Sequence, residues 1–367
     1  MDDEVPYLLL TPGPLTTSRA VKQAMLRDVS TWDRDYNDIV QQIRARLTRL
    51  VSQREDCTAV LMQGSGTFVV EATIGSVIPP QGRLLVMNNG AYGARIAQIA
   101  ARLKIDHITI TQPETEPADL RRLEETLAAD PKITHVALVH CETTTGMLNP
   151  AAEIGRAVQR QGRVFILDAM SSLGGIPIDI DEFCCDYVIA SSNKCVQGVP
   201  GFGFVIARRA QLEKTAGWAR SLSLDLYDQW REMETKGGKW RYTSPTHVVL
   251  AFEQALNELD DEGGPAARHA RYRQNHRVLV EGLTGLGYRP LLPPELRSPI
   301  ITSILYPDVA GFSFDALYDA LKAHGFVIYP GKVSQAETFR VGTIGHVFPA
   351  DFERLVHSFA EVGMAPV

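Results

Sequence analysis

The feature that most constrains this chain is a regular alternation between residues 57 and 208, where short apolar runs alternate with stretches of helical period. The apolar runs cover residues 59–62, 84–87, 107–110, 135–140, 164–168, 187–191 and 203–207. Between them, apolar side chains recur with helical spacing over residues 67–77, 91–103, 120–128 and 152–160. Strands that alternate with helices in this way form a parallel sheet covered by helices. The sequence therefore predicts an α/β domain with a mostly parallel seven-stranded sheet.

A second region begins at the breaker cluster Gly263-Gly264-Pro265, which follows a periodic stretch over residues 247–261. Beyond it we expect helices over 266–286, 314–324 and 350–362, and strands over 300–305, 327–329 and 339–341. This pattern predicts a smaller α+β domain over residues 263–367, after a large domain over 20–262. Residues 1–19 contain the stiff turn Thr11-Pro12-Gly13-Pro14 and are expected to pack with the small domain.

Composition narrows the function classes. The 37 basic and 43 acidic residues give a mild net charge of −6, which disfavours a nucleic-acid groove or a membrane-binding patch. The start Met1-Asp2-Asp3-Glu4 is acidic where a secretory segment would be basic, and no apolar run is long enough to span a bilayer. Five cysteines without a C-x-x-C pair, and nine histidines without H-E-x-x-H spacing, indicate neither disulfides nor a metal. We expect a cytoplasmic enzyme with reduced thiols and no metal.

Two polar residues follow apolar runs at the end of the sheet where ligands of open parallel sheets bind. Asp168 ends the run 164–168, where a carboxylate is either a pocket acid or a helix cap. Lys194 follows the run 187–191 and lies in a loop, residues 192–202, that is rich in glycine and proline. Most lysines are solvated, but burial here would lower the pKa of the amine and make it a nucleophile. We expect both groups to face one pocket.

A third candidate is Gly64-Ser65-Gly66-Thr67, which follows the first strand and begins a helix. Such a turn presents backbone N–H groups and hydroxyl donors to an anion, although its spacing matches neither the dinucleotide nor the triphosphate motif. A cofactor with a phosphate, a ring nitrogen that needs a carboxylate, and a carbonyl that needs a lysine would use all three candidates. Pyridoxal phosphate has these groups. We therefore expect Asp168 to bind its ring nitrogen, and Lys194 to bind its carbonyl and to move the substrate proton.

These residues belong to longer stretches that resemble the class V aminotransferases, which are pyridoxal-phosphate enzymes of fold type I. The similar stretches are residues 7–17, 89–95, 142–147, 168–175, 193–195, 239–247 and 339–342, so the resemblance spans nearly the whole chain. The chain is most similar to the members that exchange the amino group of 2-aminoethylphosphonate with pyruvate. The fold implied is a large, mostly parallel seven-stranded sheet domain with a smaller C-terminal α+β domain.

The resemblance also implies how the cofactor is held. Ser65, Gly66 and Thr67 would bind the phosphate. Tyr92 would stack on the ring, because a flat electron-poor ring prefers a flat neighbour, and Met170 would pack on the opposite face. Taken without the resemblance, an aromatic and a methionine at such places would be interpreted as ordinary core residues.

Two further roles follow from the resemblance alone. Thr143 would donate a hydrogen bond to the phenolic oxygen of the cofactor. Arg340, on the short strand of the C-terminal domain, would bind the acid group of each substrate in turn. A planar guanidinium suits either a carboxylate or a phosphonate, as a transaminase with one site for both substrates requires.

The expected reaction is transfer of the amino group from 2-aminoethylphosphonate to the cofactor, with release of phosphonoacetaldehyde, and then to pyruvate, which gives L-alanine. This would be a step of phosphonate degradation. The alternative is another class V exchange, such as alanine–glyoxylate or serine–pyruvate, because Arg340 alone does not separate phosphonate from carboxylate. A cysteine desulfurase is disfavoured because no cysteine follows Cys195. A non-catalytic ligand sensor is disfavoured because no basic stripe or DNA-binding segment is present.

The family resemblance further implies that a neighbouring subunit completes each site. Residues 239–247 would reach across, and Thr243 would add a donor to the cofactor phosphate. The alternative is that this segment is an ordinary strand-like surface. Residue types enriched at interfaces are concentrated around it: Trp230, Arg231, Trp240, Arg241 and Tyr242. We expect a two-fold homodimer with shared active sites.

Overall fold

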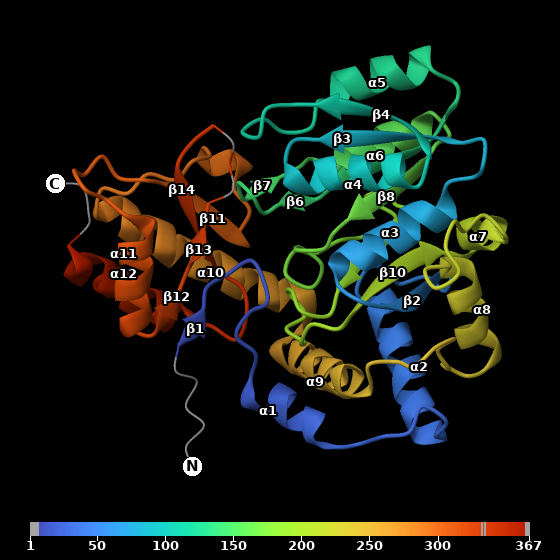
Figure 1. The fold of residues 1–367 in the computed structure, drawn as a ribbon, viewed down its shortest axis with the longest axis horizontal. Helices are drawn as coiled ribbons and strands as arrows, with labels where there is room; N and C mark the ends of the chain where they lie inside the picture. Colours follow the sequence, from blue (N-terminus) through green and yellow to red (C-terminus); the bar gives the residue numbers. More distant parts are fainter. Residues whose placement is uncertain (1–6, 332, 334, 364–367) are drawn as a thin grey trace.

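The computed structural model describes residues 7–331, 333 and 335–363, so the acidic start Met1–Glu4 lies outside the described residues. At the centre is a seven-stranded sheet of order β2-β10-β9-β8-β5-β3-β4 (Figure 1). Its strands are β2 (Cys57–Gln63), β3 (Arg83–Asn88), β4 (Asp106–Thr111), β5 (Ile133–Val139), β8 (Val164–Asp168), β9 (Tyr187–Ser191) and β10 (Phe202–Arg208). β10 runs antiparallel to both of its neighbours, and the other pairs are parallel. The predicted fold, a mostly parallel seven-stranded sheet, is confirmed.

Helices cover both faces of this sheet (Figure 1). One face packs against α3 (Gly66–Val77), α4 (Ala91–Arg102) and α8 (Leu226–Thr235). The other packs against α2 (Arg34–Arg49), α5 (Leu120–Ala129), α6 (Ala151–Arg160) and α9 (Thr246–Glu262). Because both faces are covered, the strands are apolar on both sides. Short helices at the periphery are α1 (Arg19–Gln23), η1 (Ala24–Leu26), α7 (Arg209–Leu212) and η2 (Glu213–Thr215).

The C-terminal region is built around the three-stranded sheet β11-β14-β13. Its elements are α10 (Gly264–Gly285), η3 (Pro294–Leu296), β11 (Ile301–Leu305), α11 (Phe314–Ala323), β12 (Phe326–Val327), β13 (Tyr329–Pro330), β14 (Thr338–Gly342) and α12 (Pro349–Val362). The single strand expected over residues 327–329 is wrong. The chain turns at the buried Ile328, so β12 pairs with β1 (Leu8–Leu9) while β13 pairs with β14. A smaller sheet region therefore lies beside the large sheet, as the sequence predicts.

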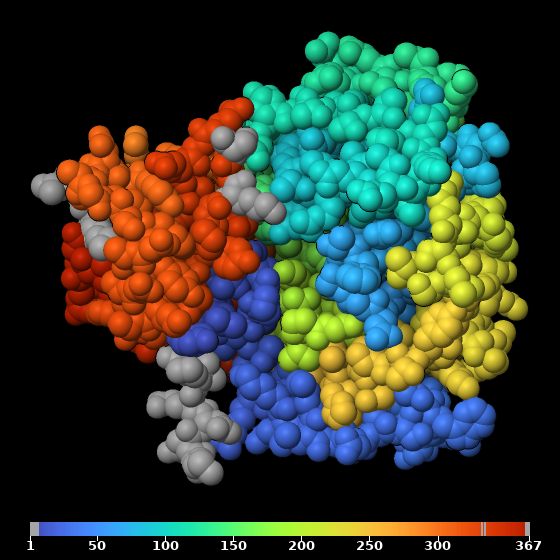
Figure 2. Space-filling model, in the orientation of Figure 1, coloured from blue at the N-terminus to red at the C-terminus, as the bar shows by residue number. Residues whose placement is uncertain are grey.

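The N-terminal segment lies between the C-terminal region and the large sheet (Figure 2). β1 runs parallel to β12, and the Gly342 N–H donates to the Leu10 carbonyl at 2.9 Å. Leu10 is buried in the C-terminal core, whereas Ser18 hydrogen-bonds Glu258 on α9. The segment thus contacts both parts of the chain. The division of the chain into domains at residues 19 and 262 stays a prediction.

Three further properties concern the described residues. None of their helices is long and apolar enough to cross a membrane. Within these same residues, no three His, Cys, Asp or Glu side chains come together as a set of metal ligands. The five cysteines are free thiols, and four of them are buried.

Candidate active site

Asp168 lies at the carboxyl end of β8, where the apolar strand meets the edge of the sheet. Its side chain is 5% exposed, and Oδ1 accepts a hydrogen bond of 2.9 Å from the Met170 N–H. Burial raises the pKa of Asp168 to about 7, and the Met170 N–H opposes this rise only in part. A cationic partner would therefore stabilise the anion of Asp168.

The loop between β9 and β10 fixes the backbone around Lys194. The Gln197 N–H donates to the Lys194 carbonyl at 2.8 Å, and the Ser192 hydroxyl donates to the carbonyl oxygens of Val199 and Phe202. Gln197 adopts a φ of 69° and its side-chain amide donates to the Tyr272 hydroxyl at 2.7 Å. The glycine- and proline-rich loop seen in the sequence is thus a rigid support for the lysine.

The amine of Lys194 is held by the N-terminal segment. Nζ donates to the Pro12 carbonyl at 2.9 Å and to the Gly13 carbonyl at 3.3 Å. A Cβ atom on Gly13, whose φ is 114°, would lie 2.5 Å from Nζ, so only glycine permits this approach. Burial lowers the pKa of Lys194 to about 8. Near pH 8 the amine is therefore partly neutral, and the neutral amine is the form that acts as a nucleophile or base.

The N-terminus of α3 forms an anion-binding turn. Ser65 is the N-cap residue, and its side chain makes no cap hydrogen bond, so the first N–H groups and the helix dipole face outward. Arg95 adds a positive charge, because its Nη1 donates to the Thr67 hydroxyl at 3.1 Å. A Cβ atom on Gly66 would lie 2.6 Å from the Met170 sulfur. Gly66 therefore keeps this turn open at the point where Met170 approaches.

A cavity of about 330 Å³ joins these groups, a volume within the range of small-molecule sites. The predicted residues that line it are Ser65, Gly66, Thr67, Tyr92, Asp168, Met170 and Lys194. Gly13, Pro14 and Arg95 line it as well. The structure thus brings the carboxylate, the amine, the anion-binding turn and an aromatic side chain to one cavity.

Arg340 and Thr143 contact each other but do not line this cavity. Arg340 is on β14 and is 2% exposed, with Nη1 donating to the Thr143 carbonyl at 2.8 Å and Nε to the Pro330 carbonyl at 3.0 Å. Its guanidinium carbon lies 5.0 Å from the centre of the Tyr329 ring. No carboxylate forms an ion pair with Arg340 among residues 7–331, 333 and 335–363, and burial lowers its pKa. A buried guanidinium held by neutral carbonyls suits an acidic ligand.

Thr243, like Thr143 and Arg340, is a predicted site residue that does not line the cavity. It is exposed in the irregular segment between α8 and α9 and does not line the cavity of its own chain. The expectation that the aromatic residues around Thr243 lie on an interface surface is wrong for Trp230 and Trp240. These side chains are 4% and 6% exposed and pack in the cores of their own chain, because β2 and β10 extend beneath them. Tyr242, which is 50% exposed, remains on the surface.

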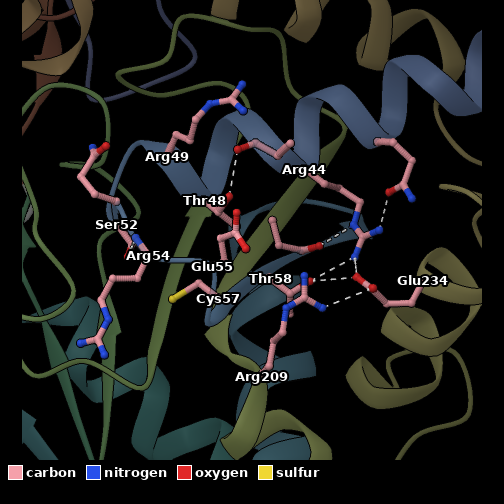
Figure 3. Close-up of a pocket in the computed structure, with 14 residues that line it drawn as sticks. Arg44, Thr48, Arg49, Ser52, Arg54, Glu55, Cys57, Thr58, Arg209 and Glu234 are labelled. Atoms are coloured by element: carbon pink, nitrogen blue, oxygen red, sulfur yellow. Dashed lines mark hydrogen bonds and ion pairs between the residues drawn. The ribbon is translucent and has the colours of Figure 1, made fainter.

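A larger cavity of about 610 Å³ lies away from these groups, between α2 and the start of β2 (Figure 3). The charged side chains at its centre are paired with one another. Arg44 donates to the Ala59 carbonyl at 2.7 Å and to Glu234, and Glu234 also forms an ion pair of 3.3 Å with Arg209. This cluster joins α2, β2 and α8, so its role is structural.

Sequence reasoning missed four residues of the site: Pro12, Gly13, Arg95 and Glu142. Pro12 and Gly13 lie 182 and 181 residues before Lys194, and no local pattern indicates their contact with it. Arg95 lies one turn after Tyr92 on α4, and its guanidinium carbon is 5.1 Å from the centre of the tyrosine ring. Glu142 could have been found from the sequence, because a charged residue that follows the apolar strand β5 and precedes Thr143 is unusual unless it has a partner.

Several known proteins are similar to this chain over nearly its whole length. The family model described as Aminotransferase class-V matches residues 16–335. A 2-aminoethylphosphonate–pyruvate transaminase of Syntrophobacter fumaroxidans is 64% identical over 353 residues, covering 96% of this chain and 95% of the relative. One of Bacillus cytotoxicus is 57% identical over 356 residues, covering 97% of each. The crystal structure of an alanine–glyoxylate aminotransferase from Nostoc sp. is similar with a TM-score of 0.89 at 28% identity, covering 99% of this chain and 97% of that one.

Proposed function

The chain belongs to the class-V aminotransferase family, and we propose that it transfers the amino group of 2-aminoethylphosphonate to pyruvate, giving phosphonoacetaldehyde and L-alanine. The observation that carries this proposal is a buried lysine and a buried carboxyl at one cavity, in a chain 64% identical over 96% of its length to an enzyme of that name.

Class-V aminotransferases use pyridoxal 5′-phosphate, and the residues present fit this group. The N-terminus of α3 with Ser65 and Thr67 suits a phosphate, and Gly66 leaves the space that a side chain would fill. Asp168, which burial drives toward its neutral form, suits a protonated ring nitrogen as its cationic partner. When bound, the cofactor supplies a carbonyl that takes up the amino group and a ring that withdraws electrons from the carbon bearing that group.

Lys194 has two tasks in this proposal. Its amine would hold the cofactor carbonyl, and when free it would take the proton from the carbon that bears the substrate amino group. A pKa of about 8 lets Nζ exchange a proton near neutral pH. The carbonyl oxygens of Pro12 and Gly13 orient the released amine, since both accept hydrogen bonds from it in the protein alone.

Arg340 binds the acid group of each substrate in turn. Its contacts to Thr143 and Pro330 use only neutral acceptors, so the positive charge is available to a phosphonate or a carboxylate. The Thr143 carbonyl accepts a hydrogen bond from Arg340, and the Thr143 hydroxyl would donate to the phenolic oxygen of the cofactor. Tyr92 and Met170, which line the cavity, would pack on the two faces of the ring.

The test of the reaction follows the cofactor spectrum. Adding 2-aminoethylphosphonate to the loaded enzyme should convert the absorbance of the lysine-bound cofactor to that of the aminated form, and pyruvate should reverse it with formation of L-alanine. L-Serine and glycine should act far more slowly. Faster conversion by L-alanine with glyoxylate, or by L-serine, would instead assign the chain to another class V exchange.

The proposed partner of the enzyme is a second copy of itself. Phe68, Leu222 and Tyr242 are 54%, 78% and 50% exposed, and Phe68 and Tyr242 border a cavity of about 470 Å³ next to the anion-binding turn. Apolar side chains exposed together in this way are typical of an interface. In a homodimer, Thr243 would add its hydroxyl to the phosphate site of the neighbouring chain.

Complementation tests the shared site. Lys194→Ala and Thr243→Ala chains, each inactive alone, should regain activity in mixed dimers, because one of the two sites then has both wild-type contributions. Light scattering should show a dimer that is more stable with cofactor than without it. A fully active monomer, or inactive mixed dimers of verified composition, would exclude the cross-subunit site.

A further inference from the structure

Glu142 is a fully buried carboxylate beside the active site for which the proposed mechanism has no task. It forms the end of the short strand β6 (Cys141–Glu142) and is 0% exposed. Its oxygens accept three hydrogen bonds: Oε2 from the Tyr92 N–H at 3.0 Å, and Oε1 from the Thr144 hydroxyl at 2.9 Å and the Thr144 N–H at 3.4 Å. Burial raises the pKa of Glu142, and the hydrogen bonds from Thr144 and Tyr92 oppose this rise because they stabilise the anion.

The first of these contacts caps a helix from outside. α4 begins after the N-cap residue Gly90, which has no side chain to accept the first N–H groups, and no acidic residue occupies its first turn. Glu142 supplies the missing acceptor at Tyr92, next to the positive end of the helix dipole. A Cβ atom on Gly90 would lie 2.3 Å from Cγ of Glu142. Glycine at the N-cap and the glutamate on β6 therefore fit each other.

The second set of contacts holds the turn between β6 and β7 (Met147–Leu148). The Glu142 carbonyl accepts from the Gly146 N–H at 2.9 Å, while its carboxylate binds Thr144. This turn carries Thr143, whose carbonyl accepts from Arg340. One carboxylate thus joins the helix that presents Tyr92 to the turn that holds Arg340.

We propose that Glu142 is a positioning residue that fixes Tyr92 and the turn 143–146 against the cofactor, and that its anion, held by these hydrogen bonds, places negative charge beside the ring. The proposal rests on the proposed function, since it assigns a role toward the cofactor of that reaction. Removal of this carboxylate should disturb both the orientation of the bound ring and the proton affinity of the lysine that holds it.

The direction of the electrostatic effect follows from the neighbouring charges. The titratable or charged groups that Glu142 influences are Cys141 beside it, Asp168 at the end of β8 and Arg340 on β14, and Arg95 on α4 acts on the same Asp168. Its charge raises the pKa of Asp168 and that of Arg340, so it favours the protonated state of both. Loss of the charge should likewise weaken protonation of the lysine-bound cofactor nitrogen.

The experiment uses the full-length, cofactor-loaded protein and two readouts besides turnover. Glu142→Gln keeps the shape, removes the charge and turns an N–H₂ group toward donors. We expect the pH midpoint of the bound-cofactor absorbance to fall by roughly half a unit or more. We also expect the visible circular dichroism that the site induces in the cofactor to weaken. Glu142→Asp keeps the charge but shortens the reach to Tyr92, so only the circular dichroism should weaken.

Glu234→Gln is the matched control, because it makes the same change away from the site. The Glu234 carboxylate binds Arg44 and the Thr58 hydroxyl. This control variant should lower the melting temperature and leave both cofactor readouts unchanged. The proposal is overturned if Glu142→Gln loses stability like the control while its pH midpoint and circular dichroism equal those of wild type. Should Glu142→Gln not fold, an unchanged dichroism in Glu142→Asp overturns it. A wild-type protein that binds cofactor without exchanging these substrates would refute the proposed reaction and leave the role of Glu142 standing.

Discussion

Replacing Asp168 by asparagine tests whether burial raises the pKa of this carboxyl in the cofactor-free protein. Burial raises the pKa of Asp168 from 3.8 to about 7. A raised pKa means that the folded state favours the protonated form. This contribution to stability is fully present below pH 3.8 and is lost as the pH rises to about 7. The difference of roughly three pKa units corresponds to about 4 kcal/mol of folding free energy lost above pH 7. Asparagine is neutral at every pH and avoids this loss.

The assay is thermal unfolding of cofactor-free wild-type and Asp168→Asn protein between pH 4 and 8. The Met170 N–H still has an acceptor in the variant, but the new N–H₂ group lacks one, at a cost of about 1–3 kcal/mol. The variant should therefore be the less stable protein at pH 4 and should gain on wild type by a few degrees as the pH rises to 7.

Asp181→Asn serves as the control of opposite sign. Arg208 holds the pKa of Asp181 below its usual value, so its stabilising effect is present at high pH and lost in acid. Relative to wild type, this variant should lose stability as the pH rises. A difference between Asp168→Asn and wild type that stays flat or falls from pH 4 to 7 would refute the reasoning about Asp168.

With the cofactor bound, Asp168→Asn should be the poorer enzyme at every pH, although its stability improves relative to wild type as the pH rises. A neutral amide does not stabilise a protonated ring nitrogen, so the electron-withdrawing power of the ring falls when negative charge develops on the substrate carbon. We expect turnover to L-alanine to fall by about 100-fold or more. Near-normal turnover would remove Asp168 from the mechanism even if the unfolding result held.

Three further predictions concern the lysine, the arginine and the N-terminal turn. Borohydride reduction of the loaded enzyme and peptide mapping should label Lys194, and Lys194→Ala should lose multiple-turnover activity by orders of magnitude; a label on another lysine contradicts the assignment. Arg340→Lys keeps the charge but loses the fork, so kcat/KM should fall by roughly 30-fold, or about 2 kcal/mol, for both substrates; loss for pyruvate alone would require a separate phosphonate site. Gly13→Ala should destabilise the protein by more than about 1 kcal/mol and slow attachment of the cofactor to Lys194, as followed by absorbance; unchanged attachment kinetics would show that the turn does not orient the amine.

The parts of the site that follow directly after strands could be predicted from the sequence. Asp168 ends a run of four apolar residues, and this abrupt change of polarity marks the carboxyl end of β8. Lys194 follows β9 in the same way, and the glycines near Ser65 mark the start of α3. In each case the information is local, because strand length, polarity and backbone freedom are properties of a few neighbouring residues.

Other parts depend on contacts between distant segments. The sheet order places β10 between β2 and β9, and no local pattern specifies that pairing. Trp230 and Trp240 have the residue types of an interface, yet they fill the two cores on either side of the sheet. Glu142 is charged and fully buried, and the reason is the N-terminus of a helix that begins 50 residues earlier in the chain. Burial of this kind is set by tertiary packing, which composition and period do not encode.

The N-terminal segment also connects the two ends of the proposed substrate site. The Leu10 carbonyl accepts from Gly342, two residues after Arg340, and two residues further along the segment Pro12 accepts from Lys194. A shift of β14 upon binding of an acid at Arg340 would therefore act on the acceptors of the lysine amine. In the protein alone, burial disfavours the charged forms of both Asp168 and Lys194. A ligand with a cationic ring nitrogen and an electrophilic carbonyl pairs the first and reacts with the second, so the unfavourable burial of both groups becomes part of the affinity for that ligand.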